Sequence, residues 1–81
     1  MALRVLAFAR LRELLGLGER ALEVDPAATL EDVWMLLTAA SPQAARMRAS
    51  TRFARNGVVV DGATRVSDGD EIALLPPVGG G

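Results

Sequence analysis

The sequence predicts an α+β domain in which a mixed sheet carries its helices on one face. Three observations predict this class: apolar segments with strand-like spacing lie near both ends of the chain, a helical pattern lies between them, and an Asn-Gly pair marks a hairpin. The chain has 81 residues, which fits one domain with a modest core. We expect residues 1–75 to form this domain and residues 76–81 to form a flexible C-terminal tail.

The first part of the chain predicts a strand, a short helix and a second strand. Residues 3–8 are apolar on both parities apart from Arg4, as in a strand that is covered on more than one side. Residues 10–15 then place leucines at helical spacing and stop at Gly16. Residues 20–24 alternate polar and apolar side chains, so we expect them to pair with the first strand as a hairpin.

The main helix is predicted to begin after Thr29 and to end near Ala40. Thr29 is a favourable N-cap, and acidic residues follow it in the first turn. We expect an apolar stripe of this helix to face the sheet. The stripe consists of Leu30, Val33, Trp34 and Leu37, with Met35 and Leu36 as further candidates. Ser41 is then expected to cap a second short helix over residues 43–48.

The last part of the chain predicts three more strands. Residues 51–54 and 58–60 flank Asn56-Gly57, which is a strong signal for a two-residue hairpin turn. Residues 71–75 form the closing strand, which is apolar on both parities after Glu71. A two-layer domain leaves one face of its sheet in water, so this excess of apolar residues is informative.

Strand parity predicts an apolar patch on the open face of the sheet. If Val5 and Leu74 point toward the helix, then Phe8 and Leu75 point away from it, and Val59 is a further candidate on the same face. Such a patch is suited to docking another protein. The competing interpretation is that the short helix or a loop folds over the patch.

The composition argues against several kinds of function. The net charge is −1, so the chain lacks the basic excess of a nucleic-acid-binding protein. It has no Cys and no His, and therefore lacks the usual thiolate nucleophile, the usual general base and the commonest zinc ligands, so we expect no metal site. Apolar runs of about five residues are too short to span a bilayer, and the N-terminus lacks a signal-peptide pattern, so we expect a cytoplasmic protein.

The final segment, Leu75-Pro76-Pro77-Val78-Gly79-Gly80-Gly81, is the candidate functional tail. The prolines stop the strand, and the glycines leave a thin thread whose only functional group is the terminal carboxylate. Because side-chain chemistry is disfavoured, the carboxylate of Gly81, with Gly80 beside it, is the best candidate for the reacting group. The chain is then a substrate or carrier that another enzyme modifies.

The tail is long enough to work at a distance from the domain. Residues 76–81 span about 20 Å at about 3.3 to 3.6 Å per residue, so the end can enter a narrow channel while the domain stays outside. We therefore expect the preceding tail residues to contact the partner protein. These residues are Pro76, Pro77, Val78 and Gly79.

Two segments carry a family resemblance that covers the whole length. Residues 5–16, Val-Leu-Ala-Phe-Ala-Arg-Leu-Arg-Glu-Leu-Leu-Gly, resemble the opening of the MoaD-type sulfur carriers, which are small subunits of molybdopterin synthase. Residues 68–81 resemble the ending of that family and are the more specific signal. The departures are mild: Ala7 and Leu74-Leu75 stand where family members often have Phe, and Gly79 stands where a small side chain is commoner.

The resemblance implies a ubiquitin-like β-grasp fold and a sulfur carrier for molybdenum cofactor biosynthesis. It implies that a ubiquitin-activating-type enzyme uses ATP to adenylate Gly81, and that sulfur then replaces AMP to give a thiocarboxylate. The sulfur passes to a pyranopterin precursor, held by the large synthase subunit, to build the dithiolene of molybdopterin. The resemblance also implies no bound cofactor, no catalysis by the chain alone and a heterotetramer of two carriers and two large subunits.

Other functions share these features. A carrier of this kind can deliver sulfur to the thiazole of thiamine, to a tRNA base or to cysteine. A ubiquitin-like modifier instead forms isopeptide bonds on target lysines, and a plain β-grasp interaction module has an inert tail. The chain length and residues 9–16 favour the molybdopterin branch, whereas the tail chemistry is common to carriers and modifiers.

Overall fold

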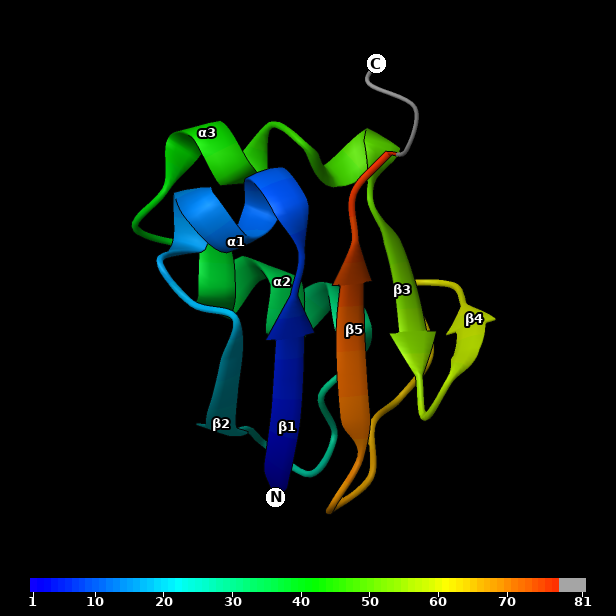
Figure 1. Ribbon diagram of the computed structural model, residues 1–81. Helices are drawn as coiled ribbons and strands as arrows, with labels where there is room; N and C mark the ends of the chain where they lie inside the picture. Colours follow the sequence, from blue (N-terminus) through cyan, green and yellow to red (C-terminus); the bar gives the residue numbers. More distant parts are fainter. Residues whose placement is uncertain (78–81) are drawn as a thin grey trace.

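The fold is a five-stranded mixed sheet with its main helix packed across one face (Figure 1). The computed structural model describes residues 1–77. The elements in chain order are β1 (Ala2–Ala7), α1 (Ala9–Leu15), β2 (Glu19–Glu23), α2 (Leu30–Thr38), α3 (Pro42–Ala45), a 3₁₀ turn η1 (Arg48–Ser50), β3 (Arg52–Arg55), β4 (Val58–Val60) and β5 (Glu71–Leu75). The strand order across the sheet is β2-β1-β5-β3-β4. β1 lies parallel to β5, and the other neighbouring pairs are antiparallel, which confirms the predicted mixed α+β class.

All five predicted strands occur: 58–60 and 71–75 match the prediction, and the ends of the other three are shifted by one residue. β1 and β2 pair as expected, and Leu3 stands opposite Leu22 although α1 lies between the two strands in the chain. The predicted β3–β4 hairpin is also present. Its turn residues Asn56 and Gly57 have φ values of 50° and 85°, the left-handed pair that a type I′ turn requires.

Helix α2 begins where its capping signal predicts. The Thr29 hydroxyl accepts a hydrogen bond from the backbone N–H of Asp32, and the Asp32 carboxylate accepts one from the backbone N–H of Thr29 at 2.9 Å. Together these bonds satisfy two donors that the first turn of a helix leaves unpaired. The buried stripe is narrower than the widest set considered from the sequence, because Met35 and Leu36 are exposed on the outer side of α2.

The second short helix is shorter than predicted. Ser41 caps it as expected, since its hydroxyl accepts a hydrogen bond from the N–H of Ala44, and Pro42 occupies the first turn. The α-helix ends at Ala45, and the chain continues as η1 rather than as a helix to residue 48. The Thr51 hydroxyl donates to the carbonyl of Met47 at 2.7 Å and holds this irregular segment against the start of β3.

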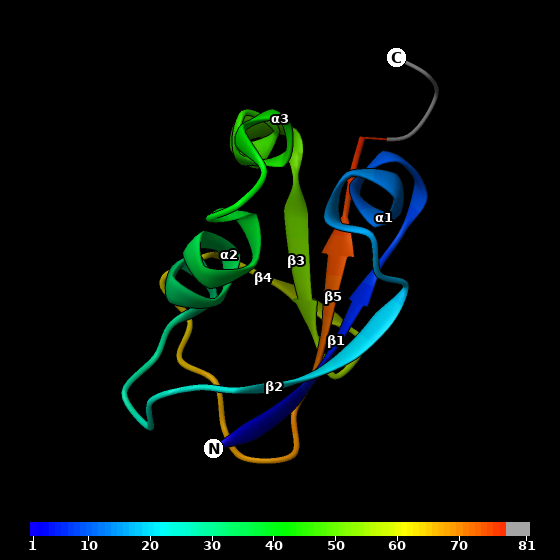
Figure 2. The ribbon, with the colours of Figure 1, turned by 90° about the vertical axis from the view of Figure 1, so that its left-hand side faces the viewer.

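The core lies between the sheet and the helices. Figure 2 shows α2 and α3 together on one side of the sheet, and α1 stands beyond the upper ends of β1 and β2 in Figure 1. The strands and α1 contribute the fully or almost fully buried side chains Leu3, Val5, Leu11, Phe53, Ile72 and Leu74. The ring of Trp34 lies 6.1 Å from that of Phe53 and joins α2 to the sheet. Within residues 1–77, no helix is long and apolar enough to cross a membrane.

Candidate functional site: the open face of the sheet and the start of the tail

The predicted open face follows from the alternation along β1. Val5 and Ala7 are buried against the helices, whereas Leu6 is half-buried on the other face. Phe8 follows the strand with an extended backbone, φ −128° and ψ 156°, so the alternation continues through it. The Phe8 side chain is 44% exposed. The parity prediction for this residue is therefore confirmed.

The strand register extends the open face across the sheet. Leu6 stands opposite Ala73, Ala73 opposite Ala54, and Ala54 opposite Val59. Directly opposed residues project to the same face, so this row is apolar across four strands. Val59 is 56% exposed and lies where the sequence placed it.

Leu75 lies one row above, opposite Arg52, and is half-buried. Leu6, Ala73 and Ala54 are additions to the predicted patch, because parity on single strands does not reveal which strands are neighbours. We call this surface the open-face patch. Its members are Leu6, Phe8, Ala54, Val59, Ala73 and Leu75, of which Ala54 is buried, at 7% exposure.

No described helix covers the open-face patch. Among residues 1–77, α2 and α3 pack on the opposite side of the sheet, and α1 lies beyond its upper end (Figure 2). The competing expectation was that the short helix or a loop folds over these residues, and for the short helix it is wrong. The physical reason is that Ala44 of α3 is fully buried in the core on the helix side, which fixes α3 there.

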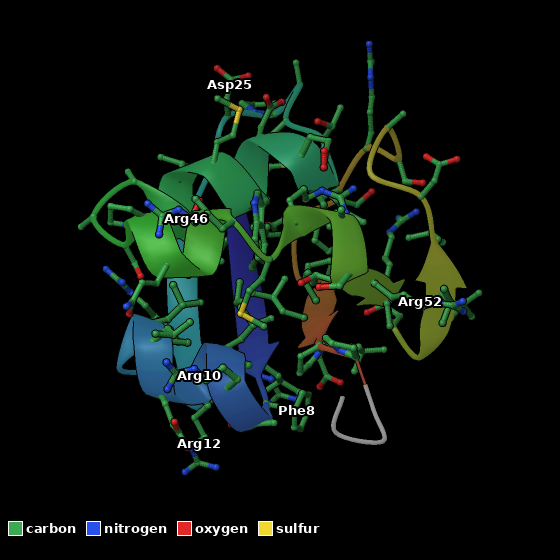
Figure 3. The ribbon with its side chains drawn as sticks, turned by 90° about the horizontal axis from the view of Figure 1, so that it is seen from above. Phe8, Arg10, Arg12, Asp25, Arg46 and Arg52 are labelled. Carbon is green, nitrogen blue, oxygen red and sulfur yellow. The ribbon has the colours of Figure 1, made fainter. Side chains whose placement is uncertain are left out.

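The tail starts at the upper edge of the open-face patch. β5 ends at Leu75, after which Pro76 is half-buried and Pro77 is exposed. Figure 3 looks down on this end of the molecule, with Phe8 and Arg52 on either side of the end of β5. The predicted site residues Val78, Gly79, Gly80 and Gly81 lie outside the described residues.

Below the patch, the open face becomes charged. Arg4 hydrogen-bonds to Glu71 on β5 and lies 3.7 Å from a carboxylate oxygen of Glu19 on β2. The hydrogen bond and the charge of Glu71, with the charge of Glu19, raise the pKa of the Arg4 guanidinium. All three side chains are well exposed, so these ion pairs contribute little to stability. Arg4 and Glu71 mark the lower limit of the apolar surface, and Glu19, which stands opposite Leu6, marks its limit on the β2 side.

The start of β5 is fixed by a buried carboxylate. Asp70 accepts hydrogen bonds from Arg55 Nε at 2.7 Å, from Asn56 Nδ2 at 2.9 Å and from the backbone N–H of Ser67 at 2.7 Å. Burial by itself raises the pKa of this carboxyl, but the three donors and the Arg55 charge outweigh it and lower the pKa below its ordinary value. The sequence predicts only a loop here. This network joins the β3–β4 turn to β5 and so sets where β5 begins.

The described part of the chain offers no metal centre. Within residues 1–77, no group of three or more His, Cys, Asp or Glu side chains is placed to hold a metal ion. The candidate site instead consists of the apolar open-face patch and the adjacent start of the tail at Pro76.

Comparison with known proteins agrees with this geometry. The curated molybdopterin synthase sulfur carrier subunit of Chlamydomonas reinhardtii is 35% identical over 83 aligned residues, and the alignment covers 100% of both chains. Among solved structures, small archaeal modifier protein 1 of Haloferax volcanii has a TM-score of 0.82 at 31% identity and 100% coverage of both chains.

Two further structures share the fold. A molybdopterin converting factor subunit 1 from Pyrococcus furiosus has a TM-score of 0.84 at 26% identity, over 96% of this chain and 99% of that one. A complex of subunits 1 and 2 of the molybdopterin-converting factor from Helicobacter pylori contains a chain with a TM-score of 0.70 at 24% identity and full coverage of both chains. At 24% identity, the likeness to the Helicobacter pylori chain shows a shared fold alone.

The likeness to these proteins confirms the ubiquitin-like β-grasp fold and the resemblance to MoaD-type sulfur carriers. The model of the ThiS family matches residues 5–81, which is nearly the whole chain. The chain therefore belongs to the ThiS family.

Proposed function

We propose that the chain carries sulfur for molybdopterin synthase. The observation that carries this proposal is the continuity of the open-face patch with the start of the tail at Pro76. A partner that buries Phe8, Val59 and Leu75 receives the tail at the same time. The name of the curated Chlamydomonas reinhardtii relative supports the molybdopterin branch.

The proposed chemistry takes place at the carboxylate of Gly81. A terminal carboxylate with an ordinary pKa of about 3.5 is anionic at neutral pH and is a poor electrophile. An activating enzyme transfers AMP from ATP to it and releases pyrophosphate. A sulfur nucleophile then displaces AMP at the carbonyl carbon and leaves a thiocarboxylate. This sulfur attacks a carbon of the pyranopterin precursor and displaces an oxygen leaving group, which gives a thioester between Gly81 and the pterin. Water then cleaves the bond between the Gly81 carbonyl carbon and the sulfur, which leaves the sulfur on the pterin and returns Gly81 to a carboxylate.

The described residues contribute docking rather than bond making. The open-face patch supplies apolar area, and each side chain buried by a partner contributes about 1.5 to 3 kcal/mol by leaving water. The prolines at the end of β5 direct the chain away from the sheet, because neither can donate a ladder hydrogen bond. We propose the large synthase subunit as the main partner. A chain of the same fold occurs with subunit 2 in the Helicobacter pylori complex.

Truncation of the tail tests the proposal. We expect removal of Gly81, or of Gly80 and Gly81, to abolish sulfur transfer in a reconstituted synthase assay, because the reacting carboxylate is displaced. Thermal unfolding should match that of the parent, since the core residues found among residues 1–77 all lie before Pro76. Retained sulfur transfer by the truncated chain would refute the carrier function.

A second candidate function is protein modification, which the likeness to small archaeal modifier protein 1 favours. Mass spectrometry of the chain, incubated with its activating enzyme, ATP and a sulfur source, separates the two. Exchange of one terminal oxygen for sulfur indicates a carrier, and a series of covalent conjugates to other proteins indicates a modifier. An unchanged mass contradicts both.

A further inference from the structure

The two edges of the sheet differ in chemistry. β2 forms one edge and carries Glu19, Arg20 and Glu23, all exposed. Charges of this kind prevent other strands from pairing with an edge. β4 forms the opposite edge and consists of three valines, of which Val58 is 63% exposed and Val59 is 56% exposed. The β4 edge therefore lacks the charged protection that β2 has.

Hairpin geometry shows which backbone groups of β4 face outward. Asn56 and Gly57 form a two-residue type I′ turn, so Arg55 and Val58 are the pair that exchanges hydrogen bonds. The next pair, Ala54 and Val59, is then the pair without hydrogen bonds between its members. The N–H and C=O of Val59 consequently point to the free edge. Within residues 1–77, no turn or loop residue bonds to these two groups.

Space beside β4 is available for another chain. In Figure 1, β4 is the outermost strand on its side of the sheet, with no element beyond it. An added strand needs the outward N–H and C=O for hydrogen bonds and shallow apolar sites for its alternate side chains, and β4 offers both.

Val59 connects this edge to the open-face patch. Its side chain lies in the apolar row with Ala54, while its backbone faces the free edge. A protein that docks on the patch can therefore contact both the side chain and the outward backbone groups of Val59. The exposed valine side chains require an uncharged, extended segment rather than a charged one.

We propose that β4 pairs with an extended apolar segment of the large synthase subunit, which bonds to the Val59 N–H and C=O as a sixth strand. This inference rests on the proposed function, because it takes the same partner. It adds a backbone contact that fixes how the sheet is oriented on the partner.

Amide hydrogen exchange measured by NMR tests the pairing directly. We expect the Val59 amide to exchange at least about tenfold more slowly in the complex with the large subunit than in the free chain. The Val58 amide is bonded within the hairpin and serves as the internal control, with slow exchange in both states. A saturated complex in which Val59 still exchanges as in the free chain would overturn the inference and leave the proposed function intact. Failure of the two proteins to form a complex would overturn both.

A backbone substitution provides a second test. Replacing the Val59 amide by an ester removes the outward N–H and keeps the valine side chain. We expect the affinity for the large subunit to fall by about fivefold, the effect of one lost hydrogen bond. Calorimetry gives the affinity, and thermal unfolding checks that the variant remains folded.

Two controls separate the backbone contact from the side-chain contacts. The same ester at Val58 removes an internal hydrogen bond, so it should lower stability rather than affinity. Phe8→Ala should lower the affinity for the large subunit through the patch. At a saturating concentration of the large subunit, the Val59 amide of this variant should still exchange slowly. Unchanged affinity of the Val59 ester variant would contradict the proposed strand pairing.

Discussion

The two faces of the sheet are built from the same strands but have different chemistry and different tasks. On β5, Leu74 is fully buried against the helices, and its neighbour Leu75 is half-buried on the open face. On β1, Val5 is fully buried and Phe8 is exposed. Folding requires apolar side chains only on the face that packs against the helices. The apolar residues of the second face are therefore best explained by binding, because exposed apolar area adds nothing to the stability of the isolated domain.

Matched leucine substitutions on β5 give the largest predicted contrast. Leu74→Ala should lower the free energy of unfolding by about 3 kcal/mol, because it removes a fully buried side chain and leaves a cavity. Leu75→Ala should cost less than about 1 kcal/mol of stability and should instead weaken binding to the large subunit by about tenfold. Chemical denaturation and calorimetry measure the two effects. Equal losses of stability in the two variants would contradict the assignment of the faces.

Replacing the buried carboxylate of Asp70 should have the next largest effect. The three donors to Asp70 keep its pKa below the ordinary value, so its contribution to stability is fully present above about pH 4 and is lost as the pH falls through the lowered pKa. Asp70→Asn should lower the free energy of unfolding by about 2 kcal/mol near pH 7.

The pH dependence supplies the control for this prediction. Once the pH falls below the lowered pKa of Asp70, the native carboxyl is itself protonated, so the stability difference between Asp70→Asn and the parent should shrink. Denaturation curves of both proteins, recorded from neutral pH into this acidic range, measure the difference. A difference that stays constant over this range would mean that the negative charge of Asp70 contributes nothing. The open-face patch should be unaffected, because Asp70 lies at the opposite end of β5 from Leu75.

The smallest predicted effect concerns the bend that separates the two faces on β1. Ala9 has a φ of 50°, which is unfavourable for a residue with a Cβ, and it turns the chain so that Phe8 remains outside while Leu11 enters the core. Ala9→Gly should raise the free energy of unfolding by about 1 kcal/mol or slightly less, since glycine adopts this conformation without strain but loses more entropy on folding.

A second alanine provides the matched control. Ala45 in α3 is exposed and has an ordinary helical φ, so Ala45→Gly should destabilise the domain by about 1 kcal/mol. Thermal unfolding of the two variants should therefore shift in opposite directions. Destabilisation by both would show that the Ala9 backbone is not strained.

Local signals predicted most of the elements. Thr29 caps α2, Gly16 ends α1 with a φ of 69°, and Asn56-Gly57 forms its hairpin, because each depends on the conformational preference of one or two residues. The end of α3 was predicted less well. No proline or glycine stops that helix. After it, Arg48 bonds to Glu31 of α2 and to the Thr51 carbonyl, and the Thr51 hydroxyl bonds to the Met47 carbonyl.

Features that depend on contacts between distant parts of the sequence could not be predicted from local patterns. The parity of β1 and β5 placed Phe8 and Leu75 on the open face, but it did not reveal that Ala54 and Ala73 lie between them and Val59. That requires the strand order and register. The Asp70 network was missed for the same reason, because its donors Arg55 and Asn56 are 15 and 14 residues away in sequence.

The parallel pairing of β1 with β5 has a mechanical consequence. The two strands are hydrogen-bonded from the Arg4–Glu71 pair to the Ala7–Leu74 pair and point in the same direction, so β1 starts at one end of the molecule and β5 finishes at the other (Figure 1). A pulling force applied between Met1 and Leu75 loads these bonds in shear, so they must fail together rather than one at a time. The domain should therefore resist a pulling force applied at the start of its tail. Single-molecule stretching between Met1 and Leu75 should give a higher rupture force than stretching between Met1 and Glu23. The second pair of points loads the antiparallel β1–β2 pair, whose hydrogen bonds break one after another.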